Sequence, residues 1–159
     1  MSLSIRAMRA EEADQVAEMV RGLARHIGSD VVPKLTGETL RNAADLIDVV
    51  VAEEGGRLIG ACLGLMTFST WRGAPGLYVV DLFVDPEARG RNVGLALLRA
   101  SARRFAKRGA KFIKLEVDET NTGAQRFYAR AGFAKKAEDR LHILEQDGLD
   151  LLIAEGGER

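Results

Sequence analysis

Cysteine is almost absent from this chain, and no other composition feature marks a special class of protein. The single cysteine, Cys62, excludes an internal disulfide and a zinc site built from cysteines. The 23 basic and 23 acidic side chains cancel to a formal net charge of zero, which argues against a nucleic-acid-binding protein. No His, Asp and Glu residues cluster at metal-ligand spacing, so we expect no metal site.

Long apolar runs are also missing. No stretch reaches the roughly 18 apolar residues of a membrane span, and the opening MSLSIRAMRAEEAD lacks the apolar centre of a signal peptide. We therefore expect a cytoplasmic protein with no membrane partner. At 159 residues, without repeats or a linker, residues 1–159 are predicted to form one domain.

The first half of the chain predicts strands and amphipathic helices. Residues 3–8 alternate like a strand, and a helix with apolar residues at helical spacing starts near Glu11 and ends at Gly28. Thr36 is a candidate N-cap for a second helix. Residues 48–68 predict a β-hairpin that turns at Gly55 and Gly56.

The second half predicts a buried strand followed by alternating helices and strands. Residues 77–84, LYVVDLFV, are too apolar to alternate and predict a central strand covered on both faces. We expect elements in the following order: a loop at 69–76, a helix at 92–108, a strand at 111–117, a short helix at 124–130 with a left-handed cap at Gly132, and two strands within 140–156 that turn at Asp147 and Gly148. The whole order predicts an α/β protein with a mixed sheet and helices on both faces.

The turn at residues 85–94 joins the central strand to a helix and is rich in positive charge. Between residues 86 and 114 there are nine basic side chains and one acidic one, a local charge of +8. Free N–H groups at a helix start bind phosphate, particularly where glycines such as Gly90 and Gly94 let an anion approach. The alternatives are a solvated helix face and glycines needed only for the turn.

A second segment supports the phosphate interpretation. Together, VDPEARGRNVGLALL and NTGAQRFYARAGF resemble the two sequence signatures of the GNAT acetyltransferase superfamily. The resemblance implies the GNAT fold, with a mostly antiparallel sheet of about six or seven strands, and binding of the pyrophosphate of acetyl-coenzyme A (acetyl-CoA). Asn92 stands where the family pattern has its first glycine, and asparagine adopts left-handed geometry readily. The cofactor-binding residues that the resemblance implies in this turn are Arg89, Gly90, Arg91, Asn92, Val93, Gly94 and Leu95.

The resemblance also implies roles on both sides of this turn. Main-chain groups of Leu82, Phe83 and Val84 would pair with the pantetheine amides of the cofactor and bind the developing oxyanion. Asn121, Tyr128 and Arg130 would hold the other flank of the cofactor. Tyr128 would also be the catalytic acid, and it need only donate a hydrogen bond, since a thiolate with a pKa of ~8.5 is less basic than tyrosinate at ~10.

Residues 68–84 resemble, more distantly, the diamine and spermidine/spermine acetyltransferases. Their Tyr-x-Glu-Asp strand here reads Tyr78-Val79-Val80-Asp81, so valine replaces the acidic residue usually assigned as base. Asp81 is our candidate for the catalytic base or for an anchor of the substrate ammonium; alternatively it caps a backbone irregularity. Trp71, in the preceding loop, could face a cationic amine or pack beneath the loop.

These residues predict acetylation, with acetyl-CoA as donor, of a primary amine on a small molecule: a diamine, a polyamine or a lysine-like compound. Alternatives are a protein amine, an aminoglycoside, or a non-catalytic acyl-CoA-binding domain. The resemblance further implies a homodimer, and the exposed strand edge expected for LDLLIAEG fits pairing of two copies.

Overall fold

A computed structural model describes residues 2–154 of the chain. The chain divides into two compact units, Met1–Thr122 and Gly123–Arg159. A single domain over residues 1–159 stays a prediction.

The first unit is built on one five-stranded sheet with the strand order β1-β2-β3-β4-β5. Neighbours from β1 to β4 are antiparallel, and β5 alone runs parallel to its neighbour β4. The predicted mixed, mostly antiparallel sheet is therefore confirmed, with five strands in place of six or seven. The strands are β1 (Leu3–Ala7), β2 (Asp48–Glu54), β3 (Arg57–Ser69), β4 (Ala74–Val84) and β5 (Ile113–Lys114).

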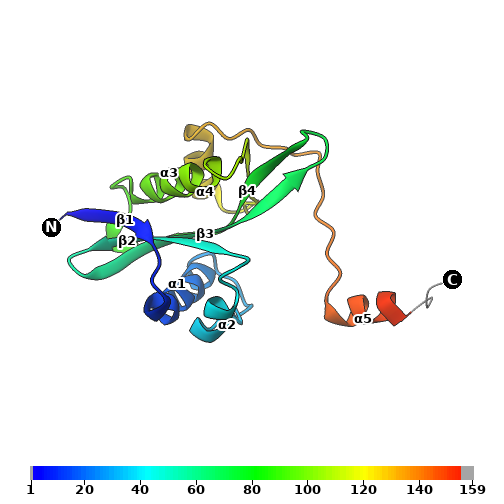
Figure 1. The fold of residues 1–159 in the computed structure, drawn as a ribbon, viewed down its shortest axis with the longest axis horizontal. Helices are drawn as coiled ribbons and strands as arrows, with labels where there is room; N and C mark the ends of the chain where they lie inside the picture. The colour runs from blue at the N-terminus through cyan, green and yellow to red at the C-terminus, as the bar shows by residue number, and fades with distance from the viewer. Residues whose placement is uncertain (1, 155–159) are drawn as a thin grey trace. The chain divides into compact units, whose positions relative to one another are not determined.

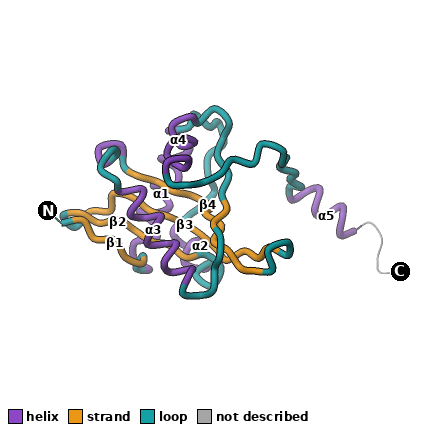
Figure 2. Tube along the Cα trace, turned by 90° about the horizontal axis from the view of Figure 1, so that it is seen from above, coloured by secondary structure: helices purple, strands orange, loops and turns teal. Residues whose placement is uncertain are grey.

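Helices cover both faces of this sheet, as predicted. On one face lie α1 (Ala13–His26), which follows a short 3-10 turn at Ala10–Glu12, and α2 (Gly37–Asn42). On the other face lies α3 (Val93–Ala106), seen over the strands in Figure 2. In Figure 1 the two layers stand on opposite sides of β2 and β3. A buried cluster joins α1 and α2 to β2 and β3, with Val16, Leu40, Val51 and Leu63 at most 2% exposed.

Short-range signals in the sequence predicted several features correctly. The Thr36 hydroxyl accepts a hydrogen bond from the Thr39 N–H at 3.1 Å and so caps α2. Gly55 and Gly56 have φ angles of +59° and +77° and turn the β2–β3 hairpin, because glycine pays no steric penalty in that region. Both features depend only on residues that are neighbours in the chain.

The loop predicted at 69–76 is wrong in length, because β3 and β4 continue to a turn at residues 70–73. Ala74, Pro75 and Gly76 pair with Ser69, Phe68 and Thr67. Gly76 serves packing here, since a Cβ at this position would lie 2.4 Å from the Phe112 ring. The strand predicted at 111–117 is likewise reduced to Ile113–Lys114.

The second unit contains α5 (Gln146–Ala154) and most of α4 (Thr122–Arg130). The left-handed residue predicted after α4 is confirmed, with Gly132 at φ +101°. The Phe133 N–H donates to the Tyr128 carbonyl at 3.0 Å and closes this helix end.

The two strands predicted within residues 140–156 are wrong. Residues 146–154 form a helix, and among the described residues after Lys114 there is no strand; residues 155 and 156 lie outside the described part. The helix satisfies its polar groups locally: the Leu149 N–H donates to the Glu145 carbonyl at 2.9 Å, and the Gln146 amide donates to Asp150 at 2.8 Å. A strand would require a neighbouring edge. The strand-edge argument for a homodimer therefore loses its basis.

Across residues 2–154, no helix combines the length and the apolarity that crossing a bilayer requires.

Candidate active site

An irregularity in β4 positions the candidate site. Leu63 on β3 pairs with Asp81, but the next residue, Gly64, pairs with Val79, so Val80 is an extra residue in β4. This β-bulge breaks the alternation of side chains along the strand. Val80 is 43% exposed, so the prediction that this strand is covered on both faces fails at the bulge.

The bulge directs Asp81 toward the face of the sheet that carries α1. Cross-strand partners share a face, and Leu63 and Ala61, the partners of Asp81 and Phe83, belong to the cluster packed against α1. The helix approaches β4 closely there, because a Cβ at Gly22 would lie 3.3 Å from the Phe83 ring. Asp81 therefore faces the C-terminal half of α1.

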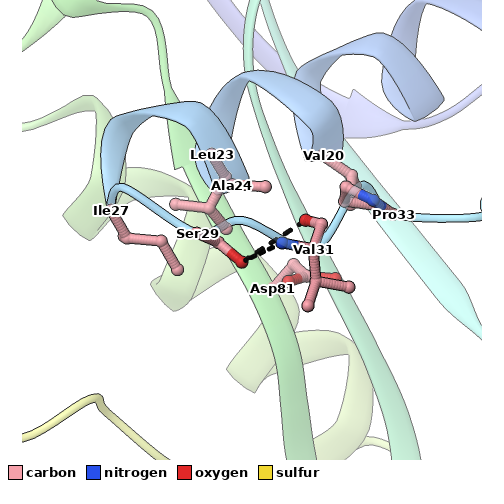
Figure 3. Close-up of a pocket in the computed structure, with 8 residues that line it drawn as sticks. All are labelled: Val20, Leu23, Ala24, Ile27, Ser29, Val31, Pro33 and Asp81. Carbon is pink, nitrogen blue, oxygen red and sulfur yellow. Dashed lines mark hydrogen bonds between the residues drawn. The ribbon is translucent and has the colours of Figure 1, made fainter.

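A cavity of about 240 Å³ lies between this part of α1, the loop that follows it, and β4. Figure 3 shows Asp81 together with the side chains of α1 and the loop. The Ser29 hydroxyl accepts a hydrogen bond from the Val31 N–H at 3.1 Å, which fixes the turn of the loop. Six apolar residues line the cavity besides Ser29 and Asp81: Val20, Leu23, Ala24, Ile27, Val31 and Pro33.

Asp81 is the one ionisable residue of the cavity lining. Within residues 2–154 its carboxylate has no hydrogen bond and no ion pair. Burial without a counter-charge raises the pKa of the Asp81 carboxyl from 3.8 to about 6. The group is thus ionised at neutral pH and yet a stronger base than an ordinary aspartate.

The edge of β4 that faces β5 is unpaired beyond the first residues. The two strands pair only at Leu77 and Tyr78, so from Val79 onward β4 has no second neighbour among the described residues. The Asp85 N–H donates to the Ile59 carbonyl on β3 at 2.8 Å. Because hydrogen-bonding direction alternates along a strand, the N–H groups of Leu82 and Val84 face the unpaired edge, whereas that of Phe83 faces β3.

The turn after β4 has the backbone geometry of an anion-binding site. Asn92 has φ +61° and ψ +17°, the left-handed conformation, directly before α3. Gly90 has φ +75°, and no atom lies within 4 Å of where its Cβ would be. The first N–H groups of α3, those of Val93, Gly94 and Leu95, have no partner within the helix. They and the helix dipole make this end attractive for phosphate.

The two arginines of the turn are held by contacts within the first unit. Arg89 donates from Nε to the Val84 carbonyl at 3.2 Å, and its Nη1 lies 3.4 Å from the ring nitrogens of His26. Arg91 makes two hydrogen bonds to Glu54, at 3.2 and 2.5 Å. That pair lowers the pKa of the Glu54 carboxyl. Both arginines are exposed, so an anion can reach them.

The remaining predicted site residues lie elsewhere. Trp71 stands at the tip of the β3–β4 hairpin, 99% exposed, and is not part of the lining around Asp81. Asn121 follows β5, with its N–H bonded to the Asp118 carbonyl at 2.9 Å. Tyr128 and Arg130 lie on α4, where the Tyr128 ring packs edge-on against Phe127 and Phe133 at centroid distances of 5.0 and 5.3 Å.

The sequence did not point to the cavity wall. The C-terminal half of α1 carries an amphipathic pattern that predicts packing against the sheet, and nothing in it shows that Leu23, Ala24 and Ile27 border a cavity. The contact between His26 and Arg89, 63 positions apart, was missed for the same reason. A signal was available in Val31 and Pro33, apolar residues in a loop.

In the described part of the chain, no three His, Cys, Asp or Glu side chains are grouped as they would be to hold a metal ion. Cys62 is fully buried, and burial raises the pKa of its thiol to about 11.

Residues 17–133 match the family model described as "Acetyltransferase (GNAT) family", well over half of the chain. One curated relative is the "Uncharacterized N-acetyltransferase MJ1207" of Methanocaldococcus jannaschii, 43% identical over 35% of this chain and 25% of that protein. Another is the thialysine N-epsilon-acetyltransferase of Bos taurus, 24% identical over 80% of this chain and 82% of that protein. The chain thus spans a quarter of the first relative and most of the second.

Solved structures agree on the fold. The integron cassette protein VCH_CASS6 of V. cholerae superposes with a TM-score of 0.78 at 22% identity, covering 98% of this chain and 99% of that one. AAC(6')-Iy, solved with a bisubstrate analogue that contains CoA, gives a TM-score of 0.73 at 18% identity, covering 92% and 99%. At these identities the likeness concerns the fold alone.

Proposed function

Because this chain belongs to the GNAT acetyltransferase family, we propose that it transfers the acetyl group of acetyl-CoA directly to a primary amine of a small molecule. The observation that carries the proposal is the Asp81 carboxylate, which has no counter-charge and borders a cavity of about 240 Å³. The thialysine enzyme is named for the same kind of acceptor, an amine on a small molecule.

Several features of the first unit support the proposed binding of a coenzyme A thioester. Its pyrophosphate would meet the N–H groups at the start of α3, the open space above Gly90, and the charges of Arg89 and Arg91. Its pantetheine amides would pair with the free edge of β4 at Leu82 and Val84. When bound, acetyl-CoA supplies an acetyl group activated as a thioester.

Asp81 acts on the amine side of the reaction. An alkylamine with a pKa of ~10.4 is mostly protonated at pH 7, and its neutral form costs about 4.6 kcal/mol. A nearby carboxylate attracts the ammonium form and can accept its proton, either directly or through water. As the N–C bond forms and the C–S bond breaks, the nitrogen loses one proton and the sulfur gains one.

Tyr128 is proposed as the donor to sulfur. It stands on α4 at the position that the second family signature assigns to this role. Its ring is braced by Phe127 and Phe133, so it presents the hydroxyl from a fixed direction within the second unit. A hydrogen bond that strengthens as charge develops on sulfur is sufficient.

The test is release of free coenzyme A from acetyl-CoA with a panel of amines: putrescine, spermidine, lysine analogues, alkylamines, an aminoglycoside and a basic peptide. Turnover confined to small amines supports the proposal. Turnover only with the peptide contradicts the small-molecule acceptor, and turnover only with the aminoglycoside contradicts a diamine, polyamine or lysine-like acceptor. Tight acetyl-CoA binding by calorimetry without turnover on any amine favours an acyl-CoA-binding domain instead.

Three variants separate catalysis from binding. Asp81→Asn should abolish most turnover, whereas Asp45→Asn, at an exposed position, is the matched control and should not. Tyr128→Phe should lower kcat and leave acetyl-CoA affinity intact. An unchanged kcat in Tyr128→Phe would remove this residue from the mechanism.

A further inference from the structure

The cavity next to Asp81 combines a single charge with an apolar wall. Six of its eight lining residues are apolar, and Ser29, the remaining polar one, uses its hydroxyl in the turn with Val31. Of these eight, only Asp81 can neutralise a cation. A ligand with one positive charge would find a partner there, and a second charge inside the cavity would not.

The charged groups beside the cavity are also unsuited to a second ammonium. His26 directly precedes the lining residue Ile27, and the guanidinium of Arg89 lies 3.4 Å from the His26 ring. The Arg89 guanidinium is itself a cation, so it offers a second ammonium no partner. Asp30 lies in the same loop but is exposed and is not part of the lining, so solvent screens its attraction.

We propose that the acceptor is an aliphatic monoamine: its one ammonium pairs with Asp81, and its carbon chain lies against Val20, Leu23 and Ile27. The inference rests on the proposed function and narrows its substrate class. Diamines, polyamines and aminoglycosides are poorer acceptors, because their further charges find no partner among the lining residues.

The size of the cavity limits the length of the acceptor's carbon chain. At about 240 Å³ it is smaller than the roughly 300–1,000 Å³ of sites that hold drug-sized ligands. Each additional buried CH₂ group should raise kcat/KM about fourfold. That gain stops when the cavity is filled, so activity plotted against chain length should rise and then level off.

The first experiment compares two acceptors of equal size. Hexylamine and 1,5-diaminopentane have the same number of non-hydrogen atoms and differ in one terminal group, methyl against ammonium. With the full-length protein and acetyl-CoA, kcat/KM for hexylamine should exceed that for the diamine about tenfold or more, after correction for its two equivalent amines. Propylamine, butylamine and pentylamine complete the length series.

The second experiment tests whether a carboxylate in the cavity wall reverses the preference for hexylamine over 1,5-diaminopentane. Ile27→Glu places a carboxylate in the cavity wall at a residue that is 46% exposed, so the fold should tolerate it. It should lower kcat/KM for hexylamine and raise it for 1,5-diaminopentane. Val32→Glu adds the same charge five residues away, at a residue that is 73% exposed and outside the lining, and should leave the ratio unchanged.

The outcomes separate this inference from the proposed function. Equal or better turnover of the diamine by the wild-type protein overturns the monoamine specificity and leaves acetyl transfer to amines standing. If Asp30→Asn then removes that turnover, Asp30 is the partner of the second ammonium. Absence of coenzyme A release with every amine overturns the proposed function, and the specificity falls with it.

Discussion

The two halves of the candidate site are built in different ways. The half proposed to bind phosphate is one continuous turn, from the end of β4 through Gly90 and Asn92 to the first residues of α3. The half proposed to hold the acceptor is assembled from α1, its following loop and β4, so that Leu23 meets Asp81 from 58 positions away along the chain. The first half depends on local backbone geometry, the second on packing of distant elements.

This difference predicts how each half responds to mutation. A change in the turn should affect cofactor affinity through backbone strain, with little effect on the affinity for the acceptor. A change in the cavity should affect the acceptor and the proton chemistry, with little effect on cofactor affinity.

The largest effect is expected from Asp81→Asn. Removal of a positioned base typically costs about 10²- to 10⁴-fold, and kcat/KM for amines should fall by that amount while acetyl-CoA binding is unchanged. Steady-state kinetics with calorimetry measures both quantities. A fall in kcat identifies a base, and a rise in KM at constant kcat identifies an ammonium anchor. Loss of acetyl-CoA affinity in Asp81→Asn would contradict the separation of the two halves.

The pH dependence of kcat/KM should also report the ionisation of Asp81. The Asp81 pKa is raised to about 6, so the carboxylate loses its proton, and becomes able to act, as pH rises through that value. The kcat/KM of the wild-type protein should therefore decline below about pH 6. A profile whose acid limb persists unchanged in the residual activity of Asp81→Asn would assign that limb to another group.

Asn92→Val should weaken acetyl-CoA binding about tenfold. Asn92 is left-handed at φ +61°, a conformation that costs an L-residue roughly 1–2 kcal/mol and a β-branched one more. Asn92→Gly is the matched control and should bind within about twofold of the wild type. Calorimetric titration gives both affinities. Equal weakening in the two variants would mean that the asparagine side chain itself binds the cofactor.

Asp81→Asn should also stabilise the protein at pH 7.5. Burial raises the pKa of Asp81 from 3.8 to about 6, so ionisation disfavours the folded state by on the order of 2–3 kcal/mol above pH 6. As pH falls from 6 to 4 the carboxyl is protonated in the folded protein and the advantage of the variant disappears. Urea unfolding across this pH range measures the difference in the free energy of unfolding between the variant and the wild type. A destabilised variant would instead support Asp81 as a structural cap of the bulge.

The smallest effect is expected from Glu54→Gln. Glu54 holds Arg91 by two hydrogen bonds in an exposed ion pair. Releasing the guanidinium should tighten acetyl-CoA binding by about twofold to threefold, the scale of surface ion pairs. Glu38→Gln, on the exposed face of α2, is the control. Weaker binding in Glu54→Gln would show that Glu54 orients Arg91 toward the phosphates.

The backbone geometry of the turn at residues 85–94 could be predicted almost completely. Asn92 adopts the left-handed conformation that the glycine position of the family pattern requires, and the helix begins one residue later. The β2–β3 turn and the Thr36 cap were predicted for the same reason. Each depends on residues within a few positions of one another, where steric and hydrogen-bonding preferences act directly.

The wrong predictions concern segments whose structure depends on residues that are distant in the sequence. The apolar alternation of residues 140–145 and the Asp147-Gly148 pair predicted strands, but no edge pairs with them in residues 2–154, and residues 146–154 close their hydrogen bonds as α5. The strand predicted at 111–117 pairs with β4 over only two residues and stops short of the bulge at Val80. Strand pairing is a property of two segments, and one segment does not contain it.

The sequence by itself determined the strand–turn–helix that would hold the cofactor, because backbone sterics and helix capping act between chain neighbours. Only the tertiary structure decided the proposed acceptor site. The bulge at Val80 turns Asp81 toward α1, and the close approach of α1 at Gly22 sets the cavity beside it. Burial without a counter-charge then changes the chemistry of Asp81, and burial exists only once distant segments have packed.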